Sequence, residues 1–298
     1  MTASLEDLLS GWTGPSSVTE QDKQDRTERM IRDAVSAHKP FEDCSLSVYA
    51  KGSYPNSTNV RTDSDVDIAV QCHDVFYWEE EEPSSHPAVT PYDGIWTPAK
   101  LRSELVAALQ EKFDNQIDTS GSAAIRINSG TARVDADVVP CFDYRYYFSS
   151  GGSSVGTMVF RKNNLSRFEN FPTQHLENGR SKNTRTNSSF KKAVRILKRV
   201  ENLMLENGVH REVQSFFIEC LVYNCSDAIL NSPTWTDTIS GILVHVWDGL
   251  QGDEPSESSE RWLEVNECKY LFHSNQKWLR ADGRDFAKAA WNYLGYAE

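Results

Sequence analysis

The sequence predicts a mixed α/β protein in two parts, the first with strands and helices and the second mostly helical. Two segments of the first part, 46–51 and 65–71, alternate apolar and polar residues, which is the pattern of half-buried strands. After Ser188, apolar residues recur at the 3.6-residue spacing of an amphipathic helix. The balance of charge changes near residue 161, and we take that position as the boundary between two domains.

The predicted first domain, residues 1–160, begins with helices. Residues 1–40 carry two short apolar stripes at helical spacing, one around Leu8 and one around Ile31. We expect the N-terminal helix to pack on the second domain. After the strand at 46–51, a stretch rich in Gly, Ser, Asn and Pro predicts a loop or turn.

The segment 65–71 (DVDIAVQ) predicts a second strand. Successive side chains of a strand point to opposite faces, so its apolar and acidic residues separate. One face carries Val66, Ile68 and Val70, and the other carries Asp65, Asp67 and Ala69.

The remainder of the first domain contains one helix and further strands. Residues 79–96 are acidic and predict a surface loop. Thr97 is suited to cap a helix that has Pro98 at its first position and runs to about Phe113. Strands are then predicted at 123–128, 131–140 and within 144–160.

The predicted second domain, residues 161–298, opens with a basic segment. Residues 161–199 contain eleven Lys and Arg against two acids, a net charge of +9, so the rest of the chain carries −21. We expect Ser188 or Asn187 to cap the helix that follows, where backbone N–H groups attract anions. Further helices are predicted at 210–231, 236–250 and 283–294.

Composition narrows the class of protein. The net charge of −12 argues against a protein that coats nucleic acid over its whole surface. No apolar run approaches the roughly 20 residues that span a bilayer, and the polar N-terminus is unlike a signal peptide, so we expect a cytoplasmic protein. The six cysteines form no CxxC pair, which favours reduced, mostly buried thiols and gives no indication of zinc.

The chemistry is indicated by Gly52-Ser53 and, after eleven intervening residues, Asp65-Val66-Asp67. Two carboxylates at i and i+2 of a strand share a face, where their oxygens can hold Mg²⁺. A Gly-Ser turn offers N–H groups and a hydroxyl to phosphate oxygens. An isolated DxD is usually a solvated strand edge, but the combination with Gly-Ser is more specific. It predicts two-metal phosphoryl-type chemistry with two Mg²⁺ ions, or Mn²⁺ in their place.

A third carboxylate is expected on a neighbouring strand. The segment 133–140 (RVDADVVP) supplies Asp135 and Asp137 on one face. We choose Asp137 as the third metal ligand, since it heads the apolar run, and keep Asp135 as a possible helper.

The basic helix offers candidates for binding a triphosphate. Lys192 and Arg195 avoid the apolar stripe and are our first choices, followed by Lys198. The alternative interpretation is a solvated basic face, which is the usual fate of such charges.

At these motifs the chain resembles the DNA polymerase β-type nucleotidyltransferases. Within them, KGSYPNSTNVRTDSDVDIAV, VDADVVP and the stretch 172–200 are most similar to the bacterial cGAS/DncV-like enzymes of clade E. The resemblance implies a nucleotidyltransferase core and a helical lobe with the active site in the cleft between them. It implies synthesis of a cyclic oligonucleotide, most simply a dinucleotide, from NTPs. It also implies bases read by polar side chains, for which Asn170, His175 and Asn178 are candidates.

The resemblance places the product in antiphage signalling, where a separate effector protein reads it. We expect a monomer with no membrane partner and no long nucleic acid bound. Two alternatives stay open. One keeps the enzyme class but transfers nucleotides to RNA or to a protein, and the other is a catalytically silent nucleotide-binding module.

Overall fold

The computed structural model describes residues 4–15, 17–60, 65–83 and 92–296. The chain divides into two compact units. The sheet unit comprises Ser17–Pro55 and Ser64–Thr173, and the helical unit comprises Met1–Ser16, Asn56–Asp63 and Gln174–Glu298. The last change of unit thus lies at 173/174, where the change of charge had suggested 160/161. Strand pairing explains the difference, because the segment that follows residue 160 still adds a strand to the sheet.

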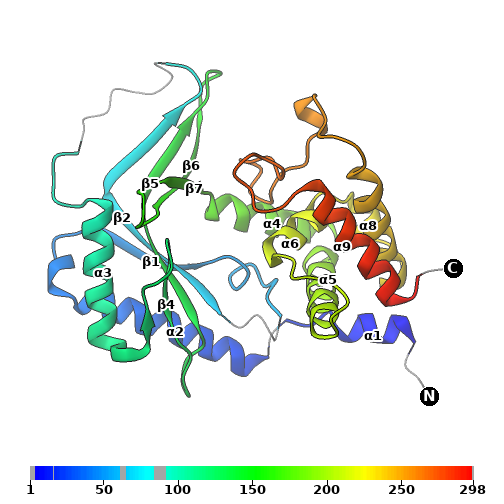
Figure 1. Ribbon diagram of the computed structural model, residues 1–298, viewed down its shortest axis with the longest axis horizontal. Helices are drawn as coiled ribbons and strands as arrows, with labels where there is room; N and C mark the ends of the chain where they lie inside the picture. Colours follow the sequence, from blue (N-terminus) through cyan, green and yellow to red (C-terminus); the bar gives the residue numbers. More distant parts are fainter. Residues whose placement is uncertain (1–3, 16, 61–64, 84–91, 297–298) are drawn as a thin grey trace. The chain divides into compact units, whose positions relative to one another are not determined.

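The sheet unit contains two long helices and the whole seven-stranded sheet. Its helices are α2 (Val18–Ala37) and α3 (Pro98–Phe113), with short 3-10 turns η1 (Lys39–Phe41) and η2 (Asp114–Gln116). Its strands are β1 (Leu46–Lys51), β2 (Val66–Glu80), β3 (Ile117–Asp118), β4 (Ile125–Ile127), β5 (Ala136–Tyr147), β6 (Ser153–Phe160) and β7 (Arg167–Asn170). Figure 1 labels most of these elements.

The sheet is mixed, since it contains both parallel and antiparallel strand pairs. Its strands run in the order β1-β2-β5-β4-β3, and β6 pairs with both β5 and β7. β2 and β5 are parallel, while the other pairs are antiparallel. The parallel pair is possible because α3 and the short strands after it return the chain to the start of the sheet. β5 therefore lies at the centre, with β2 on one side and β4 and β6 on the other.

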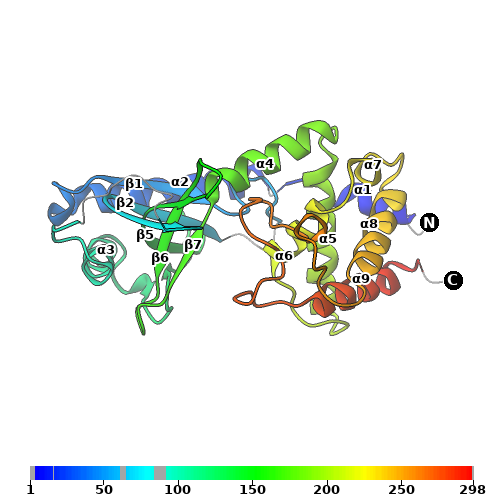
Figure 2. The same cartoon turned by 90° about the horizontal axis from the view of Figure 1, so that it is seen from above.

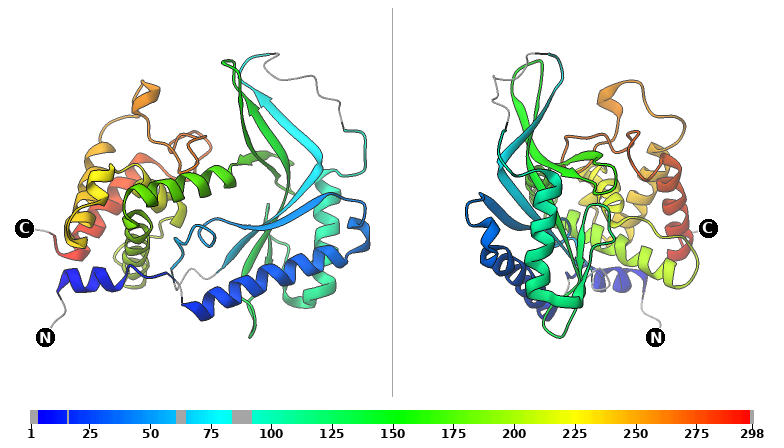
Figure 3. Two further views of the ribbon diagram at one scale, coloured as in Figure 1. Left: turned by 180° about the vertical axis from the view of Figure 1, so that it is seen from behind. Right: turned by 60° about the vertical axis from the view of Figure 1, so that its left-hand side comes forward.

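One face of the sheet carries the main core of this unit. Val66, Ile68 and Val70 of β2 join Ala136 and Val138 of β5 on that face. They pack against apolar residues of α2 and α3, which lie beside the sheet in Figures 1 and 3. The predicted alternation of 65–71 is confirmed, so the acidic positions of β2 and β5 point to the opposite face.

Two strand predictions were too short or misplaced. β2 continues to Glu80, into the region expected to be an acidic loop, and β5 runs to Tyr147. The extension exists because 76–80 pair with 143–147 across an irregularity at Cys72/Phe76. His73 and Asp74 interrupt the alternation before the aromatic residues of this segment, whereas backbone pairing holds the segment in the sheet.

The helical unit is built around α5 (Ser189–Glu206). The other helices are α1 (Leu5–Gly11), α4 (Pro172–Arg185), α6 (Ser215–Tyr223), α7 (Asp227–Leu230), α8 (Trp235–Gly249) and α9 (Arg280–Leu294), with a 3-10 turn η3 (Ser258–Glu260). Figure 2 shows α5 among α6, α8 and α9. α4 begins two residues before the unit boundary, and the polar composition of 172–185 gave no periodic signal for it.

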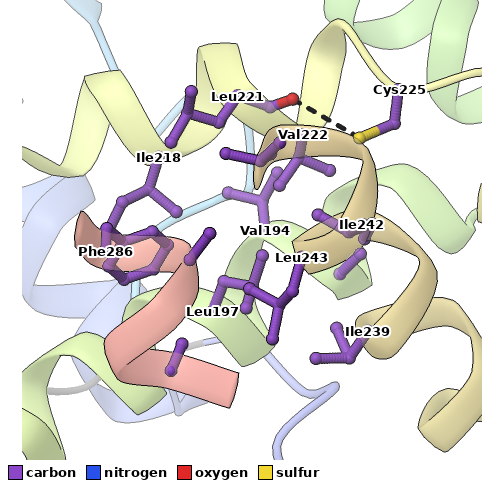
Figure 4. Packing of buried hydrophobic residues seen from close by; sticks show 14 of the residues in the cluster. Val194, Leu197, Ile218, Leu221, Val222, Cys225, Ile239, Ile242, Leu243 and Phe286 are labelled. Carbon is purple, nitrogen blue, oxygen red and sulfur yellow. Dashed lines mark hydrogen bonds between the residues drawn. The ribbon is translucent and has the colours of Figure 1, made fainter. Parts of the chain in front are cut away.

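The core of the helical unit gathers one apolar face from each surrounding helix. Val194 and Leu197 of α5 meet Ile218 of α6, Ile242 of α8 and Phe286 of α9 (Figure 4). α1 contributes the fully buried Leu9, so the N-terminal helix packs in this unit. Among the described helices, none has both the length and the apolar character needed to cross a bilayer.

The start of α5 differs from the expected cap. Ser188 occupies the N-cap position, but its backbone is left-handed and its side chain makes no capping hydrogen bond. The first N–H groups are instead satisfied from α4 and the residue after it. Thr186 accepts from the N–H of Phe190 at 3.2 Å, and Asn183 accepts from that of Lys191 at 3.1 Å. These groups therefore already have acceptors.

A buried ionic cluster lies between α4, α5, α6 and the segment Asn56–Asp63 of the same unit. Glu219 accepts hydrogen bonds from Thr58 and His175, each at 2.8 Å. Its carboxylate also lies 3.9 Å from the ammonium group of Lys198. Burial alone would raise the pKa of Glu219, but His175, Lys198 and Thr58 lower it to about 2. The cluster fixes a loop segment to three helices.

We predict that Glu219→Gln lowers the free energy of unfolding by about 3 kcal/mol, because it leaves the buried charge of Lys198 unpaired. Urea denaturation at neutral pH measures this. In the wild type, ionised Glu219 should stabilise the folded state above pH 4.5, its ordinary pKa. This stabilisation should be lost as pH falls toward 2, because the pKa of Glu219 is lowered in the folded state. The exposed Glu206→Gln is the control. Equal stability of Glu219→Gln and wild type would contradict the prediction.

Candidate active site

The parallel pairing of β2 and β5 places two of the predicted carboxylates in register. Asp67 pairs with Asp137 across the two strands. Both side chains lie on the face opposite α2 and α3 and remain partly exposed, at 47% for Asp67 and 34% for Asp137. Asp65 is exposed directly before β2. Among the described residues, the oxygens of these three carboxylates are not all within 4.8 Å of one another, as expected for like charges that repel.

Burial and a neighbouring like charge disfavour the ionised form of Asp137. The pKa of Asp137 is raised, first by burial and then by Asp67, while Arg126 and Lys51 partly offset the effect. Lys51 Nζ lies 3.6 Å from Asp67, and an Arg126 nitrogen lies 3.8 Å from Asp137. Burial thus disfavours ionisation of Asp137, and the two flanking cations offset this effect only in part.

Asp135, the possible helper, has structural partners of its own. One oxygen accepts the backbone N–H of Ser129, and the other lies 3.0 Å from Arg126. Burial opposes ionisation of Asp135, but these hydrogen bonds lower its pKa overall. Asp135 thus closes the turn before β5, and Asp137 is the carboxylate in register with Asp67.

The Gly-Ser turn touches the acidic pair directly. Gly52 follows β1, whose last residue Lys51 pairs with Asp67. Its φ of +75° is favourable for glycine, and an added Cβ would lie 2.7 Å from a carboxylate oxygen of Asp67. Gly52 is therefore required both by the turn and by the close approach of the carboxylate. Ser53 is the next residue of this turn.

Lys51 and Arg126 are site residues that the sequence analysis missed. Lys51 directly precedes the Gly-Ser pair, and that position was the available signal. Arg126 stands on β4, which was recognised as a strand, but its pairing with β5 opposite Asp137 could not be read from the sequence.

The predicted phosphate-binding residues of α5 differ in exposure. Lys192 is partly exposed. Arg195 is buried and donates to the backbone carbonyls of Thr13 and Ser57. Lys198 is 1% exposed and faces Glu219. Arg195 and Lys198 thus hold parts of the helical unit together.

The three candidates for base recognition lie at the end of β7 and on α4. Asn170 ends β7 in the sheet unit. His175 is buried in the Glu219 cluster, and Asn178 donates to the carbonyl of Val265 at 3.0 Å. Their contact with a base stays a prediction, while His175 and Asn178 have structural partners in this structure.

A cavity of about 400 Å³ in the sheet unit lies away from the carboxylates. It is lined by Pro140 and Phe142 of β5 together with residues of α3, which is the apolar face of the sheet. Arg102 at its wall already donates to the carbonyls of Gly121 and Ala123. The open acidic face, and not this cavity, is therefore the candidate site.

We predict that Asp137→Asn raises the melting temperature of the metal-free protein by about 2 °C, because it removes a charge whose pKa the fold raises. A carboxyl group whose pKa is raised in the folded state destabilises the fold only at pH values where it is ionised. The gain in melting temperature should therefore vanish below pH 3.8, the pKa of an unperturbed aspartate. Thermal unfolding with a chelator present measures it. Asp118→Asn is the control and should not raise the melting temperature, since hydrogen bonds from Ser120 lower the pKa of Asp118. A lower melting temperature for Asp137→Asn would refute the electrostatic description.

Comparison with known proteins matches this architecture over the whole chain. A family model described as the cGAS/DncV-like nucleotidyltransferase C-terminal helical domain matches residues 177–295. A cyclic dipyrimidine nucleotide synthase CdnE of Cecembia lonarensis is 32% identical over 99% of this chain and 100% of its own length.

Two solved structures share the fold. The Elizabethkingia meningoseptica CdnE cyclic dinucleotide synthase with GTP and Apcpp has a TM-score of 0.80 and 28% identity, covering 98% of this chain and 99% of that one. The Rhodothermus marinus CdnE c-UMP-AMP synthase with Apcpp and Upnpp has a TM-score of 0.84 and 25% identity, covering 98% and 97%. With a mixed sheet that carries paired aspartates beside a Gly-Ser turn, and with a matching helical domain, this chain belongs to the cGAS/DncV-like nucleotidyltransferases and resembles their CdnE members.

Proposed function

We propose that this enzyme joins two nucleoside triphosphates into a cyclic dinucleotide. The observation that carries the proposal is the in-register pair of Asp67 and Asp137, with Gly52 packed against the first of them. The names of the similar proteins support the same product class, since they are described as cyclic dinucleotide synthases. In this proposal the product is a second messenger of antiphage defence, made in the cytoplasm and read by a separate effector.

The acidic face fits divalent cations by the chemistry of its donors. Carboxylate oxygens are hard ligands of the kind that Mg²⁺ and Mn²⁺ prefer. Burial is the main cause of the raised pKa of Asp137, with the charge of Asp67 adding to it, and a bound cation would favour the ionised carboxylate. We propose Asp65, Asp67 and Asp137 as the residues that hold two Mg²⁺ ions. When bound, such ions polarise phosphoryl oxygens and neutralise charge that develops during transfer.

The chain's own residues then bind and orient the substrates. The turn at Gly52 and Ser53 offers backbone N–H groups and a hydroxyl to a triphosphate. Of the basic residues of α5, we propose Lys192 as the direct phosphate contact, because Arg195 and Lys198 already have buried partners. Arg195 and Lys198 would act by holding the segments around Thr13 and Thr58 in place.

The reaction is a displacement at the α-phosphorus. A ribose hydroxyl oxygen of one nucleotide forms a bond to that phosphorus while the bond to pyrophosphate breaks. A second transfer within the same molecule closes the ring. Two pyrophosphates are therefore released for each cyclic dinucleotide.

Two other functions predict different products. A transferase that extends RNA would need a broad basic surface, whereas this chain has a net charge of −12 and its positive charge is confined to one segment. A silent binding module would bind nucleotides and release no pyrophosphate. Both can be recognised in one assay.

We predict that Asp67→Asn reduces pyrophosphate release from NTPs and Mg²⁺ to below a few per cent of wild type without unfolding the protein. All four NTPs are supplied together, since the similar enzymes include a dipyrimidine synthase and a c-UMP-AMP synthase. A cyclic product is identified by its resistance to phosphatase and by its mass. The exposed Asp93→Asn is the matched control and keeps wild-type activity.

The proposal fails if Asp67→Asn and wild type release pyrophosphate at the same rate. Long, phosphatase-sensitive polymers from the wild type would support the RNA-tailing alternative. Nucleotide binding without pyrophosphate release would support the silent module.

We also predict that Gly52→Ala lowers the rate by about 100-fold, because the added methyl group displaces the Asp67 carboxylate. Gly151→Ala in the same unit is the control. Gly151 has a similar φ of +85°, but an added Cβ meets no atom within 4 Å. Both substitutions strain the backbone, and only Gly52→Ala reaches the site. Equal losses in the two variants would mean that the turn matters only for folding.

A further inference from the structure

A second cluster of metal-ligating side chains lies elsewhere in the sheet unit. Cys44 precedes β1, and Cys72 and Asp74 belong to β2. One ligand atom from each residue lies within 4.8 Å of the other two. The mechanism proposed above uses none of these residues.

The two sulfur atoms are separated as a tetrahedral metal would separate them. The Sγ atoms of Cys44 and Cys72 lie 3.7 Å apart. Zinc–thiolate bonds of about 2.3 Å at a tetrahedral angle place two sulfurs about 3.8 Å apart, whereas a disulfide bond is about 2.05 Å long. A hydrogen bond between two thiols also spans this distance. The position of Asp74 therefore helps to decide between a metal site and a hydrogen-bonded thiol pair.

A shared hydrogen bond joins the two sulfur atoms, and either thiol can be its donor. A metal ion bound to both sulfur atoms would take the place of that shared proton. Thiolates, and not thiols, are the ligands of soft and borderline metals.

The carboxylate of the cluster is held in place. Asp74 accepts the backbone N–H of Ser45 at 3.2 Å, so the chain on both sides of the cluster is fixed to it. Both ring nitrogens of the neighbouring His73 lie 2.8 Å from other side chains, those of Asp143 and Ser47. His73 is therefore not a fourth ligand.

The cluster is accessible and distinct from the candidate active site. Cys72 is fully buried, Cys44 is half-buried and Asp74 is exposed, so an ion can enter from the side of Asp74. Cys72 shares the helix-covered face of the sheet, whereas Asp67 points to the other face. Five residues along a strand also separate the two by about 16 Å.

We infer that Cys44, Cys72 and Asp74 form a site for a thiophilic divalent cation, specifically Zn²⁺, with its fourth position open to water. Binding releases the protons of the thiols to solvent. The site differs from the expectation drawn from the sequence, where no cysteine pair had zinc-site spacing. The metal would join the turn before β1 to β2, two segments 28 residues apart, and would stabilise the sheet unit.

The test titrates the full-length, chelator-treated protein with Co²⁺, which reports its ligands by absorption. We expect the intense near-ultraviolet band of thiolate-to-cobalt charge transfer, together with visible bands of a tetrahedral ion. One equivalent of Zn²⁺ should abolish these bands. Zn²⁺ should also raise the melting temperature by about 5 °C.

Variants identify the ligands. Cys44→Ser should abolish the charge-transfer band and the effect of Zn²⁺ on melting temperature, and Asp74→Asn should weaken Co²⁺ binding at least about tenfold. These two variants suffice if the buried Cys72→Ser does not fold. Cys268→Ser, at another half-buried cysteine, should behave as wild type.

Asp67→Asn should keep the full band, because cobalt bound only by carboxylates lacks thiolate charge transfer. The Asp67→Asn titration therefore distinguishes the proposed zinc site from the proposed catalytic site. A wild-type protein without a charge-transfer band would overturn the inference. So would a band that survives Cys44→Ser, or one that disappears in Asp67→Asn.

Discussion

The parallel register of β2 and β5 is the constraint on which the site depends. It sets Asp67 beside Asp137 and, through the alternation of each strand, sends both to the face opposite α2 and α3. The apolar residues between them pack on α2 and α3 and secure the register, since a slip of one residue would turn every side chain to the wrong face. The fold thus uses its hydrophobic core to hold together charges that repel each other, which is how a cation site is prepared.

The segment between the Gly-Ser turn and Asp65 belongs mostly to the helical unit. The chain leaves the sheet unit after Pro55 and re-enters it at Ser64. Between these points, Thr58 binds Glu219, and Ser57 receives Arg195. Buried charges are costly unless paired, so the Glu219 cluster holds Thr58 in a defined place. The two halves of the proposed catalytic motif are therefore joined by a chain segment that belongs to the other unit.

In the structure, two of the predicted phosphate-binding residues in the basic segment 161–199 contact the protein itself. The sequence suggested a phosphate-binding face, because cations at helical spacing look alike whether they meet a ligand, solvent or the protein itself. Arg195 and Lys198 meet the protein, and the first N–H groups of α5 are occupied by Thr186 and Asn183. Lys192 is the partly exposed member of the predicted set.

The sequence by itself determined the fold class, the alternation of the acidic strands and the Thr97 cap of α3, because these depend on local periodicity and spacing. By the same reasoning it proposed Gly52, Asp67 and Asp137 as site residues. Tertiary structure alone decided which strands pair, how far β2 and β5 extend, that Lys51 and Arg126 flank the carboxylates, and that Cys44 meets Cys72. Those features arise from contacts between residues distant in the chain, and no local pattern encodes which distant backbone or charge a side chain will meet.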